Sequence, residues 1–222
     1  MQQKRLRKGE PHLLSFVEVE RGRRMATVDR VERTMADAPS GRRFAEPAIH
    51  LHWITPPLVL AQVVIAWVML SLPENAPNAG GLFNLHKSLG LTLWLIVLAR
   101  LAWRFTHPAP HPGREMPRWM DLAGKANHWL MYLVLFAMPI SGFVLSATGP
   151  YGVKFWGLPL PKLPQNEALH KLAETGHWAA QWALYALVLL HVAATVYHVA
   201  VRRDGTLERM LPAQTRADPD PV

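Results

Sequence analysis

The sequence predicts an all-α membrane protein whose four transmembrane helices form one bundle. Half of the 222 residues are hydrophobic, yet the charged residues gather in a few stretches between apolar segments, a pattern typical of membrane proteins. Four apolar segments are each about as long as a membrane span of roughly 20 residues. None of the four contains Asp or Glu, and they cover residues 54–72, 86–103, 128–147 and 177–201.

A polar segment precedes the four spans and another follows them. Residues 1–46 are rich in arginine and contain no long apolar run, so we expect a basic, disordered extension without a signal-peptide core. The transmembrane domain is predicted to cover residues 47–211, and residues 212–222 to form a flexible tail. Cysteine is absent, so any haem must be held noncovalently and without thiolate ligands.

Basic residues collect on one side of the predicted bundle. Eleven Lys and Arg residues precede His50, and more lie in the 105–127 loop and in the tail. On the other side the 71–85 loop has none, and the 148–176 loop has three lysines offset by two glutamates. The positive-inside rule therefore predicts a multi-pass protein with both termini in the cytoplasm. Membrane orientation thus accounts for the net charge of +8, and nucleic-acid binding is not predicted.

Two histidines in the last span predict two cofactor sites. His177 and His191 are fourteen residues apart, which in an α-helix places them on one face about 21 Å apart along the axis. Histidine is costly in lipid and usually marks a functional site, and imidazole is a common axial ligand of haem iron. We therefore interpret the chain as a bundle that encloses two haems b, one near each membrane face.

The depth of the other histidines predicts their partners. His86 starts the second span on the outer side, at the same depth as His177. His52 starts the first span on the cytoplasmic side, at the depth of His191. The predicted iron ligands are therefore His86 with His177 and His52 with His191, because bundles build cofactor sites from inward side chains on facing helices.

Other interpretations of the histidines remain open at this point. His50 lies about 200° around the helix from His52 and competes for the inner haem only if it faces inward. His198 follows His191 by seven residues on the same face. A ligand at His198 would separate the irons by about 31 Å, more than the hydrocarbon thickness, so its predicted role is a bond to a haem propionate or a quinone. Each histidine could also be an interfacial side chain that reaches the headgroups.

Several further residues are candidates for contacts with the haems. Arg100 and Arg104 share a face at the cytoplasmic end of the second span and either neutralise propionates or anchor the helix. At the outer end Lys87 either neutralises a propionate of the outer haem or snorkels to the headgroups. His128 is predicted to bond a propionate or a quinone. Gly90 removes bulk either for a porphyrin or for close helix packing.

Five motifs in order carry a resemblance to a known family. They are IHLHW, LHKSLGL, RLAWRFTHPAP, NHWLMYLVLFAMPISGF and LHVAATVYHVAVRRDGTLERML. The chain resembles the prokaryotic cytochrome b561 family over about residues 44–212. The resemblance implies a di-haem cytochrome b of the bacterial inner membrane, with His52, His86, His177 and His191 as the iron ligands. The N-terminal extension departs from the family's pattern.

The resemblance also implies a function. Two axial imidazoles leave no open position on either iron, which favours electron transfer over oxygen chemistry. The expected activity is that of a quinone-linked oxidoreductase, with ubiquinone as acceptor and superoxide or another small periplasmic reductant as donor. An outer patch of Lys87, Lys154 and Lys162 would attract an anionic donor. The expected partners are membrane lipid, quinone, this donor and a redox partner protein.

Two other function classes are alternatives. The chain could be the haem-carrying membrane anchor of a multi-subunit dehydrogenase or hydrogenase. It could also be a metal transporter that uses the same histidines. The transporter is disfavoured because no Asp or Glu in the spans compensates the charge of a divalent cation.

Overall fold

A computed structural model describes residues 43–73, 76–110 and 116–212, all within the compact unit Gly41–Val222. Within these described ranges four helices are long and apolar enough to cross a membrane, which confirms the predicted all-α membrane fold. They are α2 (Glu46–Ser71), α3 (Ala79–Thr106), α4 (Arg118–Ala147) and α5 (Glu167–Tyr197). Most of the predicted N-terminal extension and of the C-terminal tail lies outside the described residues, and the domain boundaries stay a prediction.

Each helix begins seven to ten residues before the apolar segment that predicted it. α2 begins at Glu46 with a proline in its first turn, where the missing N–H costs nothing. α5 begins at Glu167, and the side chain of Asn166 accepts a hydrogen bond from the backbone N–H of Leu169 at 2.9 Å. Hydropathy detects only the lipid-exposed length of a helix, whereas capping residues determine where the helix starts. Leu60, Leu133 and Leu189 are exposed along the helices, which suits contact with lipid.

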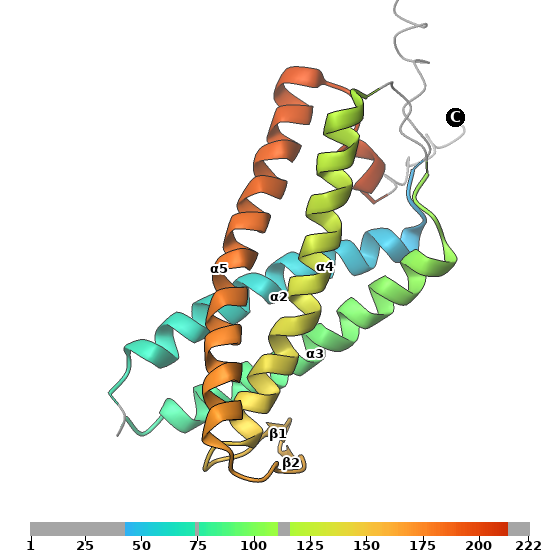
Figure 1. Cartoon of the computed structure of the whole chain (residues 1–222). Coiled ribbons are helices and arrows are strands. Elements are labelled where there is room, and N and C mark those ends of the chain that lie inside the picture. The colour runs from blue at the N-terminus through green and yellow to red at the C-terminus, as the bar shows by residue number, and fades with distance from the viewer. Residues whose placement is uncertain (1–42, 74–75, 111–115, 213–222) are drawn as a thin grey trace, which may run out of the picture. The chain divides into compact units, whose positions relative to one another are not determined.

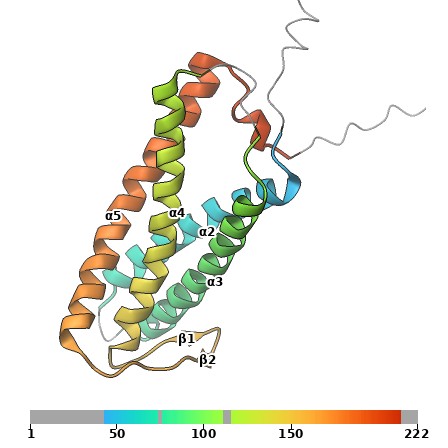
Figure 2. The same cartoon turned by 45° about the vertical axis from the view of Figure 1, so that its right-hand side comes forward.

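The helices form two antiparallel pairs. Figures 1 and 2 show α2 beside α3 and α4 beside α5, and α3 also packs against α4. We call the end where α4 leads into α5 the hairpin end, because the strands β1 (Lys154–Phe155) and β2 (Leu158–Pro159) pair there. We call the opposite end, where α2 and α4 begin, the terminal end. There α5 continues as the π-helical turn η1 (His198–Arg202), followed by the 3-10 turn η2 (Glu208–Met210).

Residues seven apart form three layers along the helices. Seven residues are two helical turns, or about 10 Å of rise, and this spacing keeps side chains on one seam of a bundle. The middle layer is apolar, because buried Leu93, Leu135 and Leu184 pack together with Val97. Seven residues from these leucines, toward the hairpin end, lie His86, Gly142 and His177. Seven residues from them in the other direction, toward the terminal end, lie Arg100, His128 and His191. An apolar layer thus separates two layers that contain histidines.

The β-hairpin is attached to the start of α3. Trp156 and Gly157 both have positive φ angles, 49° and 93°, as a type I′ turn requires. This backbone conformation is costly for a bulky residue. The backbone N–H of Trp156 donates to the Ser88 hydroxyl at 3.0 Å, and its indole N–H donates to the Thr92 hydroxyl at 3.1 Å. These bonds hold the hairpin beside the helical turn that carries His86.

The segment after α5 closes the terminal end. The backbone N–H of Phe44 donates to the Arg209 carbonyl at 3.2 Å, and the indole of Trp53 donates to the Met210 carbonyl at 2.6 Å. The Arg209 guanidinium donates to the Pro110 carbonyl at 2.7 Å. The start of α2, the end of α3 and the C-terminal segment are therefore tied together next to His52.

Candidate functional site

The structure brings the four predicted ligands together as two pairs. The hairpin-end pair is His86 of α3 and His177 of α5, whose ring centroids are 6.5 Å apart. The terminal-end pair is His52 of α2 and His191 of α5, with centroids 6.2 Å apart. In each pair α5 faces a helix of the other antiparallel pair. The pairs are those that depth in the sequence predicts.

Both separations fit one metal ion between two imidazoles. An imidazole nitrogen binds a metal at about 2 Å, and the ring centroid lies about 1 Å behind that nitrogen, so two rings on opposite sides of an ion have centroids about 6 Å apart. The distances of 6.5 and 6.2 Å are close to this value. The residues at both places therefore suit a bis-histidine haem.

Hydrogen bonds orient the ring of His177. Its Nδ1 lies 3.0 Å from the carbonyl oxygen of Met138 and 3.2 Å from the hydroxyl of Ser141. A carbonyl only accepts, so Nδ1 carries the proton and the lone pair is on Nε2. Ligand histidines are usually held in this way, with the other ring nitrogen bonded to a carbonyl. The tautomer of His177 is therefore the one that binds iron through Nε2.

The facing ring, His86, is held through its backbone. Its carbonyl accepts a hydrogen bond from Nε2 of Gln62 at 3.0 Å. Its buried Nδ1 has no hydrogen-bond partner among the described residues. A buried polar atom without a partner is costly and calls for an explanation. The described residues thus complete the hydrogen bonding of His177 but not that of the His86 ring.

Two glycines, Gly142 and Gly90, lie where neighbouring side chains leave no room for a Cβ atom. The sequence left open whether Gly90 makes room for a porphyrin or for close helix packing. A Cβ atom on Gly142 would lie 3.0 Å from Cε1 of His177, so α4 can approach this ring only without a side chain. A Cβ atom on Gly90 would lie 2.8 Å from Nε2 of Gln62. Gly90 therefore makes room for a side chain of α2, which supports the interpretation as close helix packing.

Arg100 is part of the terminal-end cluster. Its guanidinium donates to Nδ1 of His52 at 3.1 Å and to the hydroxyl of Thr55 at 3.0 Å, and it lies 5.7 Å from the ring centroid of Tyr132. Because a guanidinium cannot accept, Nδ1 of His52 must accept here and Nε2 carries the proton. Iron binding through Nε2 needs the other tautomer, so a bound haem would leave Arg100 available to an anionic partner.

His128 adds a third imidazole at the terminal end. Its ring centroid lies 5.2 Å from that of His191, and its Nδ1 donates to the Gly124 carbonyl at 2.7 Å. The free Nε2 can therefore accept a hydrogen bond. Together with His52, Arg100 and His191, this cluster has one residue from each of the four helices, which is how bundles build cofactor sites.

The remaining predicted residues make contacts outside the two pairs. Lys87 donates to the Gly152 carbonyl at 2.9 Å, and half-buried Arg104 lies one helical turn beyond Arg100. The ring of His50 is 72% exposed and lies 3.7 Å from the carboxylate of Glu46. It therefore points away from the bundle, as its helical position predicts.

His198 bonds to a buried carboxylate beyond the end of the last span. Its Nδ1 lies 2.7 Å from Asp204, whose side chain is 4% exposed. Burial alone would raise the pKa of Asp204, but hydrogen bonds from Thr206, His198 and Arg202 lower it to about 2. The carboxylate stays charged and holds the Nδ1 side of the imidazole.

The sequence interpretation missed three polar residues near the two pairs. Ser141 bonds His177, Gln62 bonds the carbonyl of His86, and Thr55 bonds Arg100. Small polar side chains are common in membrane helices, so composition gave no reason to select them. Each of them bonds to a residue of a neighbouring helix. They could have been found only with the relative positions of the helices known, since each lies at the same depth as its partner.

The chain is similar in sequence to several known proteins. Residues 43–213 match the family model described as prokaryotic cytochrome b561. Cytochrome b561 homolog 1 of Escherichia coli (strain K12) is 28% identical over 177 residues, which cover 77% of this chain and 97% of that protein. The probable superoxide oxidase CybB of Yersinia pestis is 31% identical over 169 residues, 74% of this chain and 93% of that protein. Cytochrome b562 of Cereibacter sphaeroides is 26% identical over 167 residues, 73% of this chain and 91% of that protein.

Proposed function

Because the chain belongs to the prokaryotic cytochrome b561 family, whose members transfer electrons in membranes by means of haem b, we propose that it passes electrons across the membrane through two bis-histidine haems b. His86 and His177 would hold one haem, and His52 and His191 the other. The observation that carries the proposal is the presence of two imidazole pairs, each with a centroid separation near 6 Å, at two depths of one bundle.

We place the hairpin end in the periplasm and the terminal end in the cytoplasm of a bacterial inner membrane. The positive-inside rule carries this orientation. The hairpin end has the 71–85 loop without Lys or Arg, whereas the terminal end has Arg43, Arg104, Arg118 and Arg202 close to the ends of the spans. Both chain termini would then lie in the cytoplasm.

A small anionic reductant would deliver electrons at the hairpin end. The Lys87 and Lys162 ammonium groups donate to the carbonyls of Gly152 and Pro150, at 2.9 and 2.6 Å, so two positive charges meet at one turn of the loop. A local positive charge attracts anions from solution. Superoxide suits this end because it gives up one electron, becomes dioxygen and releases no proton. The name of the Yersinia pestis relative also points to superoxide.

The haems, when bound, supply reversible one-electron redox chemistry. The residues of the chain hold them and insulate them. His52, His86, His177 and His191 would hold the two irons, two imidazoles to each, which suits electron transfer rather than dioxygen chemistry. The layer of Leu93, Leu135 and Leu184 separates the two sites and keeps water out. Arg100, released from His52, would pair with a propionate by a charge-assisted bond.

Ubiquinone is the proposed acceptor at the terminal end. Nε2 of His128 is free to accept, and the carboxylate of Asp204 orients His198 beyond the last span. Either imidazole could hydrogen-bond a quinone oxygen or exchange a proton with it.

A spectroscopic experiment tests this function. Purified protein is mixed with enzymatically generated superoxide, with and without ubiquinone-1, while the haem bands are recorded. We expect superoxide to reduce the haems and ubiquinone-1 to reoxidise them, and superoxide dismutase to abolish the reduction. Haem bands that do not respond to superoxide would contradict the donor, and a protein without haem would contradict the function.

A further inference from the structure

A second histidine repeats the arrangement of His177 one step further toward the hairpin end. His170 precedes His177 by seven residues on α5, and Thr148 follows Ser141 by seven at the end of α4. Nδ1 of His170 lies 3.1 Å from the Thr148 hydroxyl, just as Nδ1 of His177 lies 3.2 Å from the Ser141 hydroxyl. Because α4 and α5 are antiparallel, the two pairs lie in consecutive layers, about 10 Å apart.

The Thr148 hydroxyl determines the tautomer of His170. Thr148 Oγ1 lies 2.8 Å from the Val144 carbonyl oxygen, which can only accept, so the single hydroxyl proton is donated there. The hydroxyl oxygen must then accept from Nδ1–H of His170. In the neutral ring the lone pair is therefore on Nε2, and this nitrogen can take a proton from a bound molecule.

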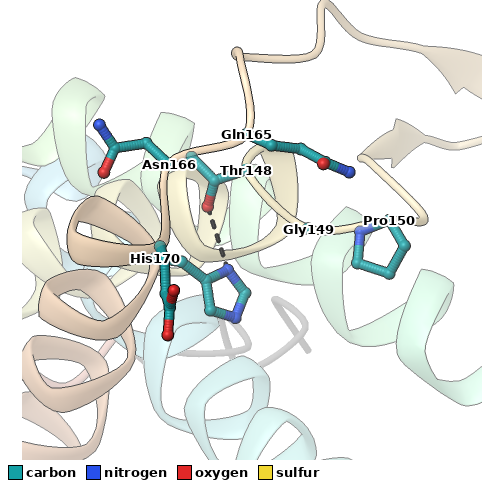
Figure 3. Close-up of a pocket in the computed structure, with 7 residues that line it drawn as sticks. Thr148, Gly149, Pro150, Gln165, Asn166 and His170 are labelled. Carbon is teal, nitrogen blue, oxygen red and sulfur yellow. Dashed lines mark hydrogen bonds between the residues drawn. The ribbon is translucent and has the colours of Figure 1, made fainter.

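An open surface pocket of about 250 Å³, called the cavity below, lies beside this ring. Figure 3 shows the Thr148 hydroxyl directed at His170, with Pro150 on the neighbouring loop. Most of the lining surface is apolar, and Glu167 is the only formally charged residue among the seven that line the cavity. Pockets for small molecules combine an apolar wall with a few polar groups in this way. The Glu167 carboxylate in the lining disfavours an anion inside the pocket, whereas the Lys87 and Lys162 ammonium groups lie on the loop outside the lining residues.

We propose that this cavity binds a neutral, water-soluble hydroquinone of one ring, and that Nε2 of His170 accepts its hydroxyl proton while an electron leaves for the hairpin-end site. The proposal rests on the proposed electron-transfer function and adds a second class of donor to it. Gly149 and Pro150 offer an apolar surface to the ring, and His170 offers the base. Such a donor differs from superoxide, because its oxidation releases a proton that needs an acceptor.

The oxidation takes place in two one-electron steps. One O–H bond of the hydroquinone would break, its proton would move to Nε2 of His170, and one electron would leave for the haem that His86 and His177 would hold. The donor is left as a neutral radical. Once His170 has returned the proton to water and the first electron has passed on toward the terminal end, the second O–H bond would break in the same way and the quinone would leave. Two protons and two electrons are thus released for each hydroquinone.

Binding is tested with resorcinol, which has the two hydroxyls of a hydroquinone but does not form a quinone. Oxidised holoprotein in detergent is titrated with resorcinol while the ¹⁵N signals of its histidine side chains are followed by NMR. We expect the His170 signals to shift in a saturable manner, and the binding to weaken in Thr148→Val and vanish in His170→Gln. The control His107→Gln, in an exposed ring at the other end, should bind like the wild type. No saturable shift, or equal binding by all variants, would overturn the proposal.

Catalytic use of the site is tested by the rate of haem reduction in a stopped-flow experiment. With 1,4-benzohydroquinone as reductant, His170→Gln should be slower by about 100-fold, the usual contribution of a general base. With dithionite, an anion that carries no hydroxyl proton, His170→Gln and wild type should be equally fast. Equal losses with both reductants would show that His170 supports only the structure, and no loss with either would show that it takes no proton. A wild type without haem would refute the proposed function, while resorcinol binding would still decide the site.

Discussion

The guanidinium of Arg100 donates a hydrogen bond to Nδ1 of His52 at 3.1 Å. This bond holds the ring in the tautomer whose Nε2 carries the proton. Iron binding by Nε2 requires the opposite tautomer, so haem binding and this hydrogen bond exclude each other. A haem held by His52 through Nε2, as proposed, would therefore leave Arg100 to pair with another group, such as a haem propionate.

Replacing Arg100 by glutamine should lower the midpoint potential of the terminal-end haem. A nearby cation disfavours the ferric state, which has one more positive charge, so its removal stabilises that state. At partly buried separations of several ångströms the effect is on the order of 50 mV. Redox titration of the haem bands measures it. Arg104→Gln, one helical turn further out, is the control and should shift the potential less; an upward shift in Arg100→Gln would contradict the assignment.

Removing one ligand from each pair should remove one haem at a time. We expect His86→Ala to lose only the hairpin-end haem and His52→Ala only the terminal-end haem, because the pairs share no residue. Haem content and low-temperature spectra of the purified variants measure the loss. His50→Ala is the matched control, since its ring is 72% exposed. If His52→Ala retained both haems with normal spectra, another residue would be the ligand.

Gly142 should be the glycine to which the hairpin-end haem is most sensitive. A Cβ atom there would lie 3.0 Å from Cε1 of His177, whereas a Cβ atom on Gly124 of the same helix would meet nothing within 4 Å. We expect Gly142→Ala to shift the spectrum and potential of this haem and Gly142→Leu to prevent its binding. Gly124→Ala should match the wild type in both measurements. Identical spectra of the two alanine variants would refute the close approach of α4.

His191 and His198 should behave differently although they share a helix face. The ring centroid of His191 lies 6.2 Å from that of His52, whereas Nδ1 of His198 bonds to the carboxylate of Asp204. His191→Ala is expected to abolish the terminal-end haem. His198→Ala should keep this haem but slow its reoxidation by ubiquinone-1. Complete loss of the haem from His198→Ala alone would reverse the assignment.

The sequence predicts much of the fold because lipid imposes one simple rule, which is a long apolar stretch for each helix. The same rule, together with helix geometry, predicts the pairing of His86 with His177, because a helical rise converts sequence position into depth. The β-hairpin was not predicted. Its positive-φ Trp156 is stable only because Ser88 and Thr92, more than sixty residues away, accept its N–H groups.

Side-chain contacts between helices could not be predicted from the sequence. The bond of Gln62 to the carbonyl of His86 and that of Ser141 to His177 depend on how neighbouring helices are rotated and shifted. Hydropathy contains no information on this register. The recurrence of His128, Leu135 and Gly142 at intervals of seven residues does contain some, since it marks one face of α4.

The number of haems b per chain tests the central claim most directly. A pyridine haemochrome assay on purified protein, with the polypeptide quantified by amino-acid analysis, gives this ratio, and a redox titration of the same sample separates the components. Two imidazole pairs with centroids 6.2 and 6.5 Å apart predict two haems b per chain and two midpoint potentials. One haem per chain, or none, would contradict the account.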